Sequence, residues 1–349
     1  MEKTNNLKIL NIISGASQGG AEKFFERFSI SIQKQKGIEQ RVIIKKNKRR
    51  CNFLRQNKIM LEELAFRSKF DFYTRKKIKK VIEDFKPDIV LSWMNRASDM
   101  IPVDRNNYKS IGRLGGYYKI KNYLNCDYLI ANTEDIKTYI IEQGWDPKKV
   151  FYVPNFVEKK ENNIIKRQNL TTPKNKKIIL GLGRFHENKG FDILIKALKS
   201  LPEHYLWLLG NGEMRKKYND LAESYNLKNR IRLIDWVDNP SAFYNTADML
   251  VCPSRLEPLG NIIIEAWAHK IPVIASNIMG PKKLIKNEVN GLKFELENIE
   301  ELVSCVKRVS NEKKLEKKLI VNGYKDYISK YSENIIMKKF KSLFWEVSK

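Results

Sequence analysis

Two carboxylates eight residues apart mark the stretch of this sequence whose chemistry is easiest to infer. Glu257 stands in a polar loop after an apolar strand predicted at 249–252, and Glu265 stands inside an apolar helix predicted at 262–269. As an ordinary surface acid Glu265 would need a solvated helix face, but apolar residues surround it in the run IIIEAWA. The pattern therefore predicts two carboxylates at one strand–loop–helix junction, where both can accept hydrogen bonds from hydroxyl groups.

The loop before this helix is a candidate anion site. The main-chain N–H groups of Leu259, Gly260 and Asn261 stand at the helix start, where the positive end of the helix dipole adds to them. A diphosphate suits these groups, Glu265 is placed for the two hydroxyls of a ribose, and Glu257 is placed for those of a sugar ring. A nucleotide sugar combines all three.

Arg184 and Lys189 form a second candidate anion site. They stand in a loop between a strand that ends in Gly-Leu-Gly at 181–183 and a helix predicted from Phe191. Open α/β sheets bind ligands at the carboxyl ends of their strands, so this position favours a diphosphate clamp over two surface charges. We interpret His186, between the two cations, as a polar loop residue.

These two stretches resemble the retaining GT-B glycosyltransferases of family 4, the glycosyl transferases group 1. Glu257 and Glu265 match the Glu-x7-Glu motif, and Arg184 with Lys189 matches the GR-x(4)-KG motif. The resemblance implies that Glu257 contacts the donor sugar as a catalytic residue, that Glu265 holds the ribose, and that the two cations hold the diphosphate. It covers nearly the whole chain and is thin only from 47 to 99.

The resemblance adds further donor-site residues. Gly19 and Gly20 stand in a GGAE segment similar to the family's N-terminal loop, although two glycines alone indicate only a strand–helix turn. Gly212 ends a turn similar to the family's G-x-G. Trp236 stands at the exit of a strand predicted at 231–237, which by resemblance lines the nucleobase pocket.

One departure from the family concerns a histidine that many relatives carry near the strand corresponding to 109–114. This chain has no histidine before His186, and Arg113 is the candidate catalytic substitute, with Asp99 as another. The departure keeps a second interpretation open, a non-catalytic nucleotide-sugar-binding protein of the same fold. An epimerase or a phosphorylase is a third, but nothing marks the pyridoxal-phosphate lysine that a phosphorylase needs.

Alternating strands and helices predict an α/β chain with two Rossmann-like domains. By resemblance the fold is GT-B, with the domains facing each other across a cleft. The expected parts are an N-terminal acceptor-side domain at 1–157, a linker at 158–177, a nucleotide-sugar-binding domain at 178–330, and a C-terminal helix at 331–349 that crosses back to the first domain.

Length and composition limit the remaining possibilities. A chain of 349 residues suits two domains, and four cysteines without a CxxC pair, with three histidines, argue against a zinc site and for a reducing compartment. The N-terminus has no signal-peptide pattern, and no apolar run approaches 18 residues. We expect a cytoplasmic enzyme without metal or cofactor, whose donor substrate is a nucleotide diphosphate sugar.

The net charge of +26 has several interpretations. Region 45–80 carries 14 basic and three acidic residues with interleaved aromatics, which fits an anionic membrane surface. A solvated helix that packs its apolar face on its own sheet fits equally, and no nucleic acid is expected because no recognition module is visible. The charge itself reflects either function or a compositional bias, since Lys, Asn and Ile are all abundant.

These expectations combine into one reaction. The protein moves a sugar, with retention and without metal, from a nucleotide diphosphate sugar to an acceptor hydroxyl. The acceptor is expected to be a cell-envelope glycan or glycolipid, reached from the cytoplasm, with peripheral attachment to the inner face of the membrane as a further possibility.

Overall fold

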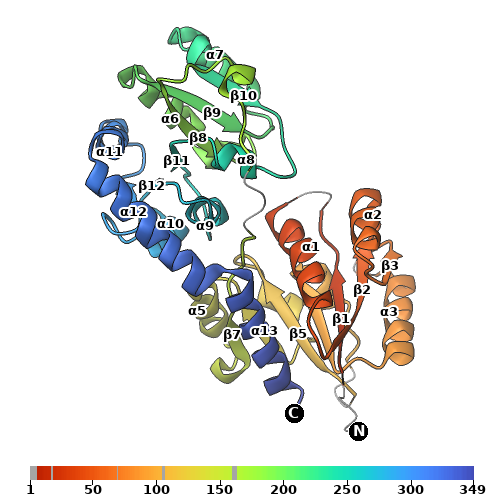
Figure 1. The fold of residues 1–349 in the computed structure, drawn as a ribbon. Coiled ribbons are helices and arrows are strands. Elements are labelled where there is room, and N and C mark those ends of the chain that lie inside the picture. Colours follow the sequence, from red (N-terminus) through yellow and green to blue (C-terminus); the bar gives the residue numbers. More distant parts are fainter. Residues whose placement is uncertain (1–5, 17–18, 69, 104–106, 159–162) are drawn as a thin grey trace. The chain divides into compact units, whose positions relative to one another are not determined.

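The structure is a computed structural model that describes residues 6–16, 19–68, 70–103, 107–158 and 163–349 (Figure 1). The chain divides into two units, the first made of residues 1–156 with 333–349 and the second of residues 157–332. Each unit is a parallel sheet with helices on both faces, so the α/β two-domain architecture is confirmed. Lys69 of the basic region and residues 159–162 of the predicted linker lie outside the described residues.

The first unit contains a seven-stranded sheet in the order β3-β2-β1-β4-β5-β6-β7. Its elements are β1 (Leu7–Ile13), α1 (Gly20–Gln33), β2 (Ile38–Lys45), α2 (Lys48–Gln56), β3 (Leu61–Leu64), α3 (Phe72–Phe85), β4 (Ile89–Trp93), α4 (Met94–Asp99), β5 (Lys109–Leu114), η1 (Ile120–Tyr123), β6 (Tyr128–Ala131), α5 (Glu134–Glu142), η2 (Pro147–Lys149), β7 (Val150–Tyr152) and α13 (Glu333–Val347).

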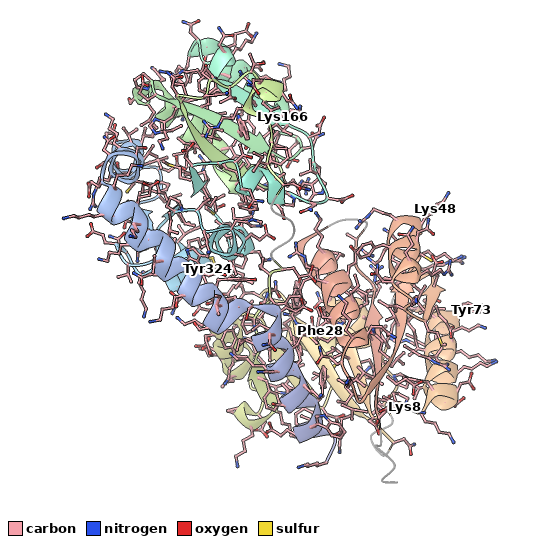
Figure 2. All side chains as sticks on the ribbon, in the orientation of Figure 1. Lys8, Phe28, Lys48, Tyr73, Lys166 and Tyr324 are labelled. Carbon is pink, nitrogen blue, oxygen red and sulfur yellow. The ribbon has the colours of Figure 1, made fainter. Side chains whose placement is uncertain are left out.

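Alternation along the strands of this sheet builds two cores. In β1, Ile9 points into the core under α1, α2 and α13, whereas Leu10 points into the core under α3, α4 and α5. Phe28 of α1 lies inside the unit, with its ring centroid 4.7 Å from that of Phe340 of α13, while Tyr73 projects from the surface (Figure 2). The C-terminal helix thus closes the first unit.

The second unit contains a six-stranded sheet in the order β10-β9-β8-β11-β12-β13. Its elements are η3 (Arg167–Leu170), β8 (Lys177–Leu182), η4 (Glu187–Lys189), α6 (Phe191–Ala197), η5 (Leu198–Ser200), β9 (His204–Leu209), α7 (Arg215–Ser224), η6 (Lys228–Arg230), β10 (Ile231–Ile234), α8 (Ser241–Tyr244), β11 (Met249–Cys252), α9 (Asn261–Ala268), β12 (Val273–Ser276), α10 (Met279–Leu284), β13 (Leu292–Phe294), α11 (Ile299–Asn311), α12 (Lys313–Asp326) and η7 (Tyr327–Tyr331).

The second sheet is also covered on both faces. Ile179 of β8 lies in a core with α6, α7 and α11, and its neighbour Leu180 lies in a core with α8, α9 and η7. Both sheets are therefore doubly wound, and in each the carboxyl ends of all strands lie at one edge, because the strands are parallel.

The polar run predicted as a linker at 158–177 is folded into the second unit over its described part. The Arg167 guanidinium donates to the Asp248 carboxylate at 3.1 Å, and the buried indole of Trp207 donates to Thr172 Oγ1 at 3.1 Å. The prediction of a linker was wrong for this part because polar side chains in the run pair with groups that the sheet leaves unsatisfied.

The basic region 45–80 does not form one amphipathic surface. It divides into α2, β3 and the start of α3, and its Leu54 and Phe66 are fully buried in the two cores. Arg50 is also buried, with Nε donating to Glu26 at 3.1 Å. Part of the charge is therefore structural, and the exposed aromatics of the described part of this region gather around the start of α3.

Candidate functional site

The candidate site of the second unit lies where the strand order reverses, between β8 and β11. Ligands of open α/β sheets bind at this point, outside the carboxyl ends of the strands. The loops after the two strands touch: the N–H groups of Arg255 and Leu256 both donate to the carbonyl of Asn188, at 2.8 and 3.2 Å. A Cβ atom on Gly190 would lie 2.0 Å from the carbonyl oxygen of Pro253, so only glycine permits this approach.

Lys189 and Glu257 meet at this junction. Lys189 Nζ lies 2.5 Å from Glu257 Oε2, and their side chains are 25% and 13% exposed. Burial alone would lower the pKa of Lys189, but the carboxylate of Glu257 outweighs it and raises that pKa above its ordinary value. The predicted phosphate cation and the predicted sugar-binding acid are thus brought together as one half-buried ion pair.

The amide of Gly260 is also used by Glu257. Gly260 N donates to Glu257 Oε1 at 3.2 Å, and Gly260 has φ of 85°, which suits a glycine that begins a helix. Leu259 is buried beside it, and Asn261 is the first residue of α9. The predicted amide cluster lies at the helix start as expected, but one of its donors is bound to a carboxylate instead of facing outward.

Glu265 lies one turn into α9 and has a partner that the sequence did not indicate. Tyr244 Oη donates to Glu265 Oε2 at 2.9 Å. The Tyr244 ring stacks on the ring of His269, with centroids 5.1 Å apart and planes 8° apart, and His269 Nδ1 lies 2.7 Å from Asn245 Oδ1. In the sequence, Tyr244 is only an aromatic residue in the run SAFY before β11, and the buried face of any helix contains such residues, so it could not be predicted as a partner of Glu265.

Arg184 lies in the same loop but is far more exposed than Lys189. Its side chain is 68% exposed and its guanidinium lies 3.1 Å from Glu213 Oε2. His186 Nε2 lies 3.5 Å from the other oxygen of Glu213, and His186 Nδ1 caps η4 through the N–H of Asn188. Each of the two predicted clamp cations therefore has its own carboxylate partner.

Gly212 and Trp236 follow the neighbouring strands β9 and β10. Gly212 has φ of 155°, and a Cβ atom there would lie 2.5 Å from the carbonyl oxygen of Phe185, in the loop after β8. Trp236 is 43% exposed, and the strand predicted at 231–237 ends at Ile234, so that the tryptophan stands in a loop. Both residues lie at the ligand-binding edge of the sheet.

Two further residues hold the loop of Glu257 and were missed by sequence reasoning. Arg255 forms a two-pronged bond to Asp192, at 2.9 and 2.8 Å, and a third bond to Glu297 at 2.6 Å. These carboxylates raise the pKa of Arg255. Gly280 N donates to the main-chain carbonyl of Glu257 at 3.0 Å, which binds the loop to α10. No local sequence pattern announces such long-range pairs.

Arg113, the predicted catalytic residue of the first unit, lies in the interior of that unit. Arg113 is 3% exposed, stacks on the rings of Phe24 and Trp93, and donates to Asn155 Oδ1 at 2.7 Å. Burial lowers the pKa of Arg113 to about 9. A guanidinium enclosed in this way is not placed to contact substrate, so the structure argues against the catalytic role predicted for it.

Gly19 and Gly20 lie at the start of α1. A Cβ atom on Gly19 would lie within 2.2 Å of the Glu22 carboxylate, whereas Gly20 has open space around its Cα. The Glu22 carboxylate is the end of a flexible side chain and Gly19 has extended backbone, so the structure requires glycine at neither position, and both residues fit the strand–helix-turn interpretation. Residues 17 and 18, before them, lie outside the described residues.

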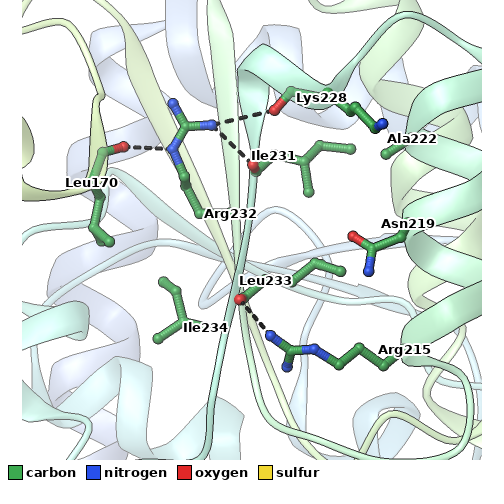
Figure 3. Close-up of a pocket in the computed structure, with 9 residues that line it drawn as sticks. All are labelled: Leu170, Arg215, Asn219, Ala222, Lys228, Ile231, Arg232, Leu233 and Ile234. Carbon is green, nitrogen blue, oxygen red and sulfur yellow. Dashed lines mark hydrogen bonds between the residues drawn. The ribbon is translucent and has the colours of Figure 1, made fainter.

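A separate cavity of about 290 Å³ lies between η3, α7 and β10 (Figure 3). Arg232 donates to the carbonyls of Leu170, Lys228 and Ile231, and Arg215 donates to that of Leu233 (Figure 3). Main-chain carbonyls thus engage both guanidinium groups, which bind η3 and α7 to the edge strand. We therefore assign these residues a structural role and not a role in catalysis or ligand binding.

Comparison with known proteins places this geometry in a family. The model of the family described as "Glycosyl transferases group 1" matches residues 162–326, which include both stretches of the site. The chain is 30% identical over 341 residues to the lipopolysaccharide core biosynthesis glycosyltransferase LpsD of Rhizobium meliloti, covering 97% of this chain and 98% of that protein. The chain belongs to the glycosyl transferases group 1 family.

A second relative and two solved structures are also similar to this chain. LpsE of Rhizobium meliloti, also a lipopolysaccharide core biosynthesis glycosyltransferase, is 30% identical over 321 residues, 91% of this chain and 93% of LpsE. A glycosyltransferase from Rickettsia africae has the same fold, with a TM-score of 0.86 at 23% identity and 99% coverage of both chains. Anabaena Alr3699/HepE, solved with UDP and glucose, has a TM-score of 0.82 at 18% identity, covering 97% of this chain and 99% of that one. The fold of this group 1 glycosyltransferase is therefore GT-B.

Neither a membrane-spanning helix nor a metal cluster occurs in the described residues. In that part of the chain no helix is long and apolar enough to cross a membrane. The same residues contain no group of three or more His, Cys, Asp or Glu side chains placed to hold a metal ion.

Proposed function

We propose that this group 1 glycosyltransferase transfers a sugar from a nucleotide diphosphate sugar to an acceptor hydroxyl, with retention at the anomeric carbon and without a metal ion. One observation carries the proposal. The half-buried pair of Lys189 and Glu257 lies at the reversal point of the second sheet, beside the start of α9, and Glu265 lies one turn along that helix. The cation and the main-chain amides suit the diphosphate, the acid beside them suits the sugar, and the acid along the helix suits the ribose.

The donor would rearrange the ion pair. A diphosphate that enters takes Lys189 as its counter-ion, and Glu257 is then released to accept hydrogen bonds from the sugar hydroxyls. Arg184, exposed in the same loop, adds a second cation by leaving Glu213. Glu265, oriented by Tyr244, accepts the ribose hydroxyls. The nucleobase then lies toward Gly212 and Trp236, beyond the neighbouring strands.

The chemistry follows from these charges. Negative charge grows on the leaving diphosphate as its bond to the anomeric carbon breaks, and Lys189, Arg184 and the helix start stabilise it in place of a metal. Positive charge grows on the sugar ring, which the Glu257 carboxylate stabilises. Retention is consistent with attack from the face that the diphosphate leaves, with the leaving phosphate accepting the proton of the acceptor hydroxyl. Arg113 has no part in this scheme, because it is enclosed by aromatic rings.

We place the acceptor in the cell envelope, as a glycan or glycolipid reached from the cytoplasmic face of the membrane. Two full-length relatives named for lipopolysaccharide core biosynthesis support this class of acceptor. Exposed aromatics at the start of α3, Phe70, Phe72 and Tyr73, stand beside exposed Lys76 and Lys80 and form a patch suited to anionic headgroups.

The membrane part is tested by sedimentation with vesicles of phosphatidylglycerol and phosphatidylcholine. Replacing Phe72 and Tyr73 by serine, with Lys76 and Lys80 by glutamine, should reduce the bound fraction several-fold. Replacing Lys216 and Lys217 of the second unit by glutamine is the matched control. Equal sedimentation of all three proteins would remove the membrane from the proposal.

The donor part is tested by calorimetry with the five common nucleoside diphosphates in EDTA, and then with their sugars. We expect one nucleotide series to bind, and Glu265→Ala to weaken it at least tenfold. Proton NMR of the sugar released by slow donor hydrolysis reports its first anomeric configuration and so tests retention. Binding without hydrolysis, or without transfer to any sugar acceptor, would favour a non-catalytic nucleotide-sugar-binding protein, and no binding would contradict the proposal.

A further inference from the structure

The first unit has its own reversal point, between β1 and β4, and a cavity lies there. In the sheet order, β2 and β3 continue on one side of β1 and β4 to β7 continue on the other. The cavity, of about 300 Å³, is lined by the residues that directly follow β1 (14–16), by Lys45 at the end of β2, by the residues that directly follow β4 (94–96), and by Tyr118. This is the position where open α/β sheets bind ligands.

Positive charge lines this cavity. Lys45 and Arg96 are both lining residues, and none of the described lining residues is an aspartate or a glutamate. Arg96 Nη1 donates to the main-chain carbonyl of Phe66 at 2.9 Å, which fixes the guanidinium without neutralising it. Among the described residues the Lys45 ammonium has neither an ion pair nor a hydrogen bond. Neither cation therefore forms an ion pair with a described residue.

Polar groups and backbone geometry at the cavity indicate a built site. Asn95 Oδ1 is buried and has no hydrogen-bond partner in the described part of the chain. Met94 has φ of 70°, a conformation that costs a non-glycine residue energy and that concentrates at ligand sites. Both features lie at the start of the short helix α4, beside the cavity, where a ligand can use them.

The Glu22 carboxylate is bound to the loop that lines the cavity. Its Oε1 accepts the N–H of Ala16 at 2.7 Å. Burial, and then the charge of Glu22, raise the pKa of Tyr118, whose hydroxyl therefore stays a neutral donor. A ligand in this cavity meets two cations and a hydroxyl, which are donors that suit a phosphate group, whereas the buried Asn95 Oδ1 is an acceptor and suits a hydroxyl group carried beside the phosphate.

We propose that this cavity binds a phosphate group carried by the acceptor, with Lys45 and Arg96 as its counter-ions. The inference rests on the proposed function, because a transferase needs an acceptor in addition to its donor. The phosphate belongs either to a soluble phosphorylated sugar or to a lipid headgroup, and the same two cations serve both. Two positive charges match the dianion of a phosphate monoester rather than a neutral glycan.

The test uses the full chain with ¹³C-labelled methionine methyl groups. Eight methionines give few resonances, and Met94→Leu assigns the one that lines the cavity. Inorganic phosphate, glucose 6-phosphate and vesicles with phosphatidic acid are the probes, with acetate and phosphatidylcholine vesicles as controls. We expect at least one phosphate probe to shift the Met94 resonance saturably, and the control probes to leave it unchanged. The soluble and vesicle probes distinguish the two sources of phosphate.

The matched variants decide the role of the cations. The double variant Lys45→Gln with Arg96→Gln should lose at least tenfold in affinity for the phosphate probe, whereas Lys217→Gln, an exposed lysine of α7, should stay within twofold. Equal affinity in the double variant, or no shift with any phosphate probe, would overturn the proposal. Lys45→Gln alone, which removes no contact among the described residues, gives the answer if the double variant folds poorly.

Failure of this inference is separable from failure of the proposed function. Nucleoside diphosphate affinity of the second unit, measured by calorimetry, should be unchanged in the double variant. Loss of phosphate binding with intact nucleotide binding supports the assignment of Lys45 and Arg96. Phosphate binding at Met94 in a protein that binds no nucleotide would keep the anion site but would contradict its assignment to the acceptor of a transferase.

Discussion

Lys189 Nζ and Glu257 Oε2 lie 2.5 Å apart, although 68 residues separate them in the sequence. The pair joins the loop after β8 to the loop after β11 and closes the reversal point of the second sheet. Because each residue neutralises the other, neither carries a bare charge in a half-buried place before a ligand arrives. One hydrogen bond holds the two groups side by side, where each can bind a different part of one donor molecule.

Lys189→Ala should weaken nucleoside diphosphate binding by about 10- to 100-fold, because the most buried cation of the site is lost. Calorimetry with the nucleotide identified in the donor screen measures this. Lys217→Ala, an exposed lysine of α7, is the control and should change the affinity less than twofold. Unchanged affinity in Lys189→Ala would remove this residue from the diphosphate site.

Glu257→Gln should reduce the transfer rate by about 10²- to 10³-fold while nucleoside diphosphate binding stays the same or becomes slightly tighter. The amide still bonds sugar hydroxyls but no longer stabilises positive charge on the ring, and Lys189 is no longer neutralised. Turnover kinetics and calorimetry on the same preparation separate the two effects. Glu203→Gln, an exposed partner of Lys176, is the control, and full activity in Glu257→Gln would contradict the role given to this acid.

Tyr244→Phe should raise the KM for the donor about threefold to tenfold with little change in kcat. The variant keeps the ring stacked on His269 but removes the hydroxyl that orients Glu265, so the ribose is held less well while the reacting atoms are unaffected. The rise in KM on changing from a ribose to a 2′-deoxyribose donor should be smaller in the variant than in the wild type. A lower kcat at unchanged KM would show that Tyr244 acts elsewhere, and Tyr225→Phe serves as the control.

The second unit should lose stability as the pH falls from about 6.5 to about 4, through His204. Burial lowers the pKa of this imidazole to about 4, so the folded unit binds fewer protons than the unfolded chain in this window. The effect is complete below the folded pKa and amounts to at most about 3 kcal/mol, from the difference between the two pKa values.

Urea unfolding of the wild type and His204→Gln at pH 7, 5 and 4 measures this contribution. The difference in the free energy of unfolding between the wild type and His204→Gln should narrow or reverse as the pH falls, because glutamine does not titrate. His204 Nε2 lies 2.8 Å from Ser310 Oγ, a bond that glutamine can keep. A difference that is the same at all three pH values would mean that His204 is not buried in its neutral form.

Local patterns were enough to predict the elements that carry the site. The alternation of apolar runs with Gly-rich loops placed Glu257 after β11 and Glu265 inside α9, and it placed Lys189 after β8, because strand and helix periods are properties of neighbouring residues. The same patterns misassigned the polar run at 158–177, since Arg167 and Thr172 look solvated until their partners Asp248 and Trp207 are known.

Arg113 shows the limit most clearly. The local sequence does not show whether an arginine near the end of a strand faces a substrate or lies between aromatic rings. The packing of Phe24 and Trp93 against Arg113 shows that it lies between rings. Trp345 of α13 is a second example: its side chain is 38% exposed while that of Phe344 beside it is buried, and both are aromatic residues of one helix.

By itself, the sequence determined two parallel sheets, the order of their elements, and the two loops that hold the candidate acids and cations, because hydrogen-bonding period and turn chemistry are local. The tertiary structure alone decided which charges meet. It paired Lys189 with Glu257, placed the Tyr244 hydroxyl on Glu265 and enclosed Arg113. It also brought Lys45 and Arg96 to one cavity of the first sheet, where no described lining residue is an acid. The physical reason is that an electrostatic partner is fixed by distance in space and by burial, and the separation of two residues along the chain constrains neither.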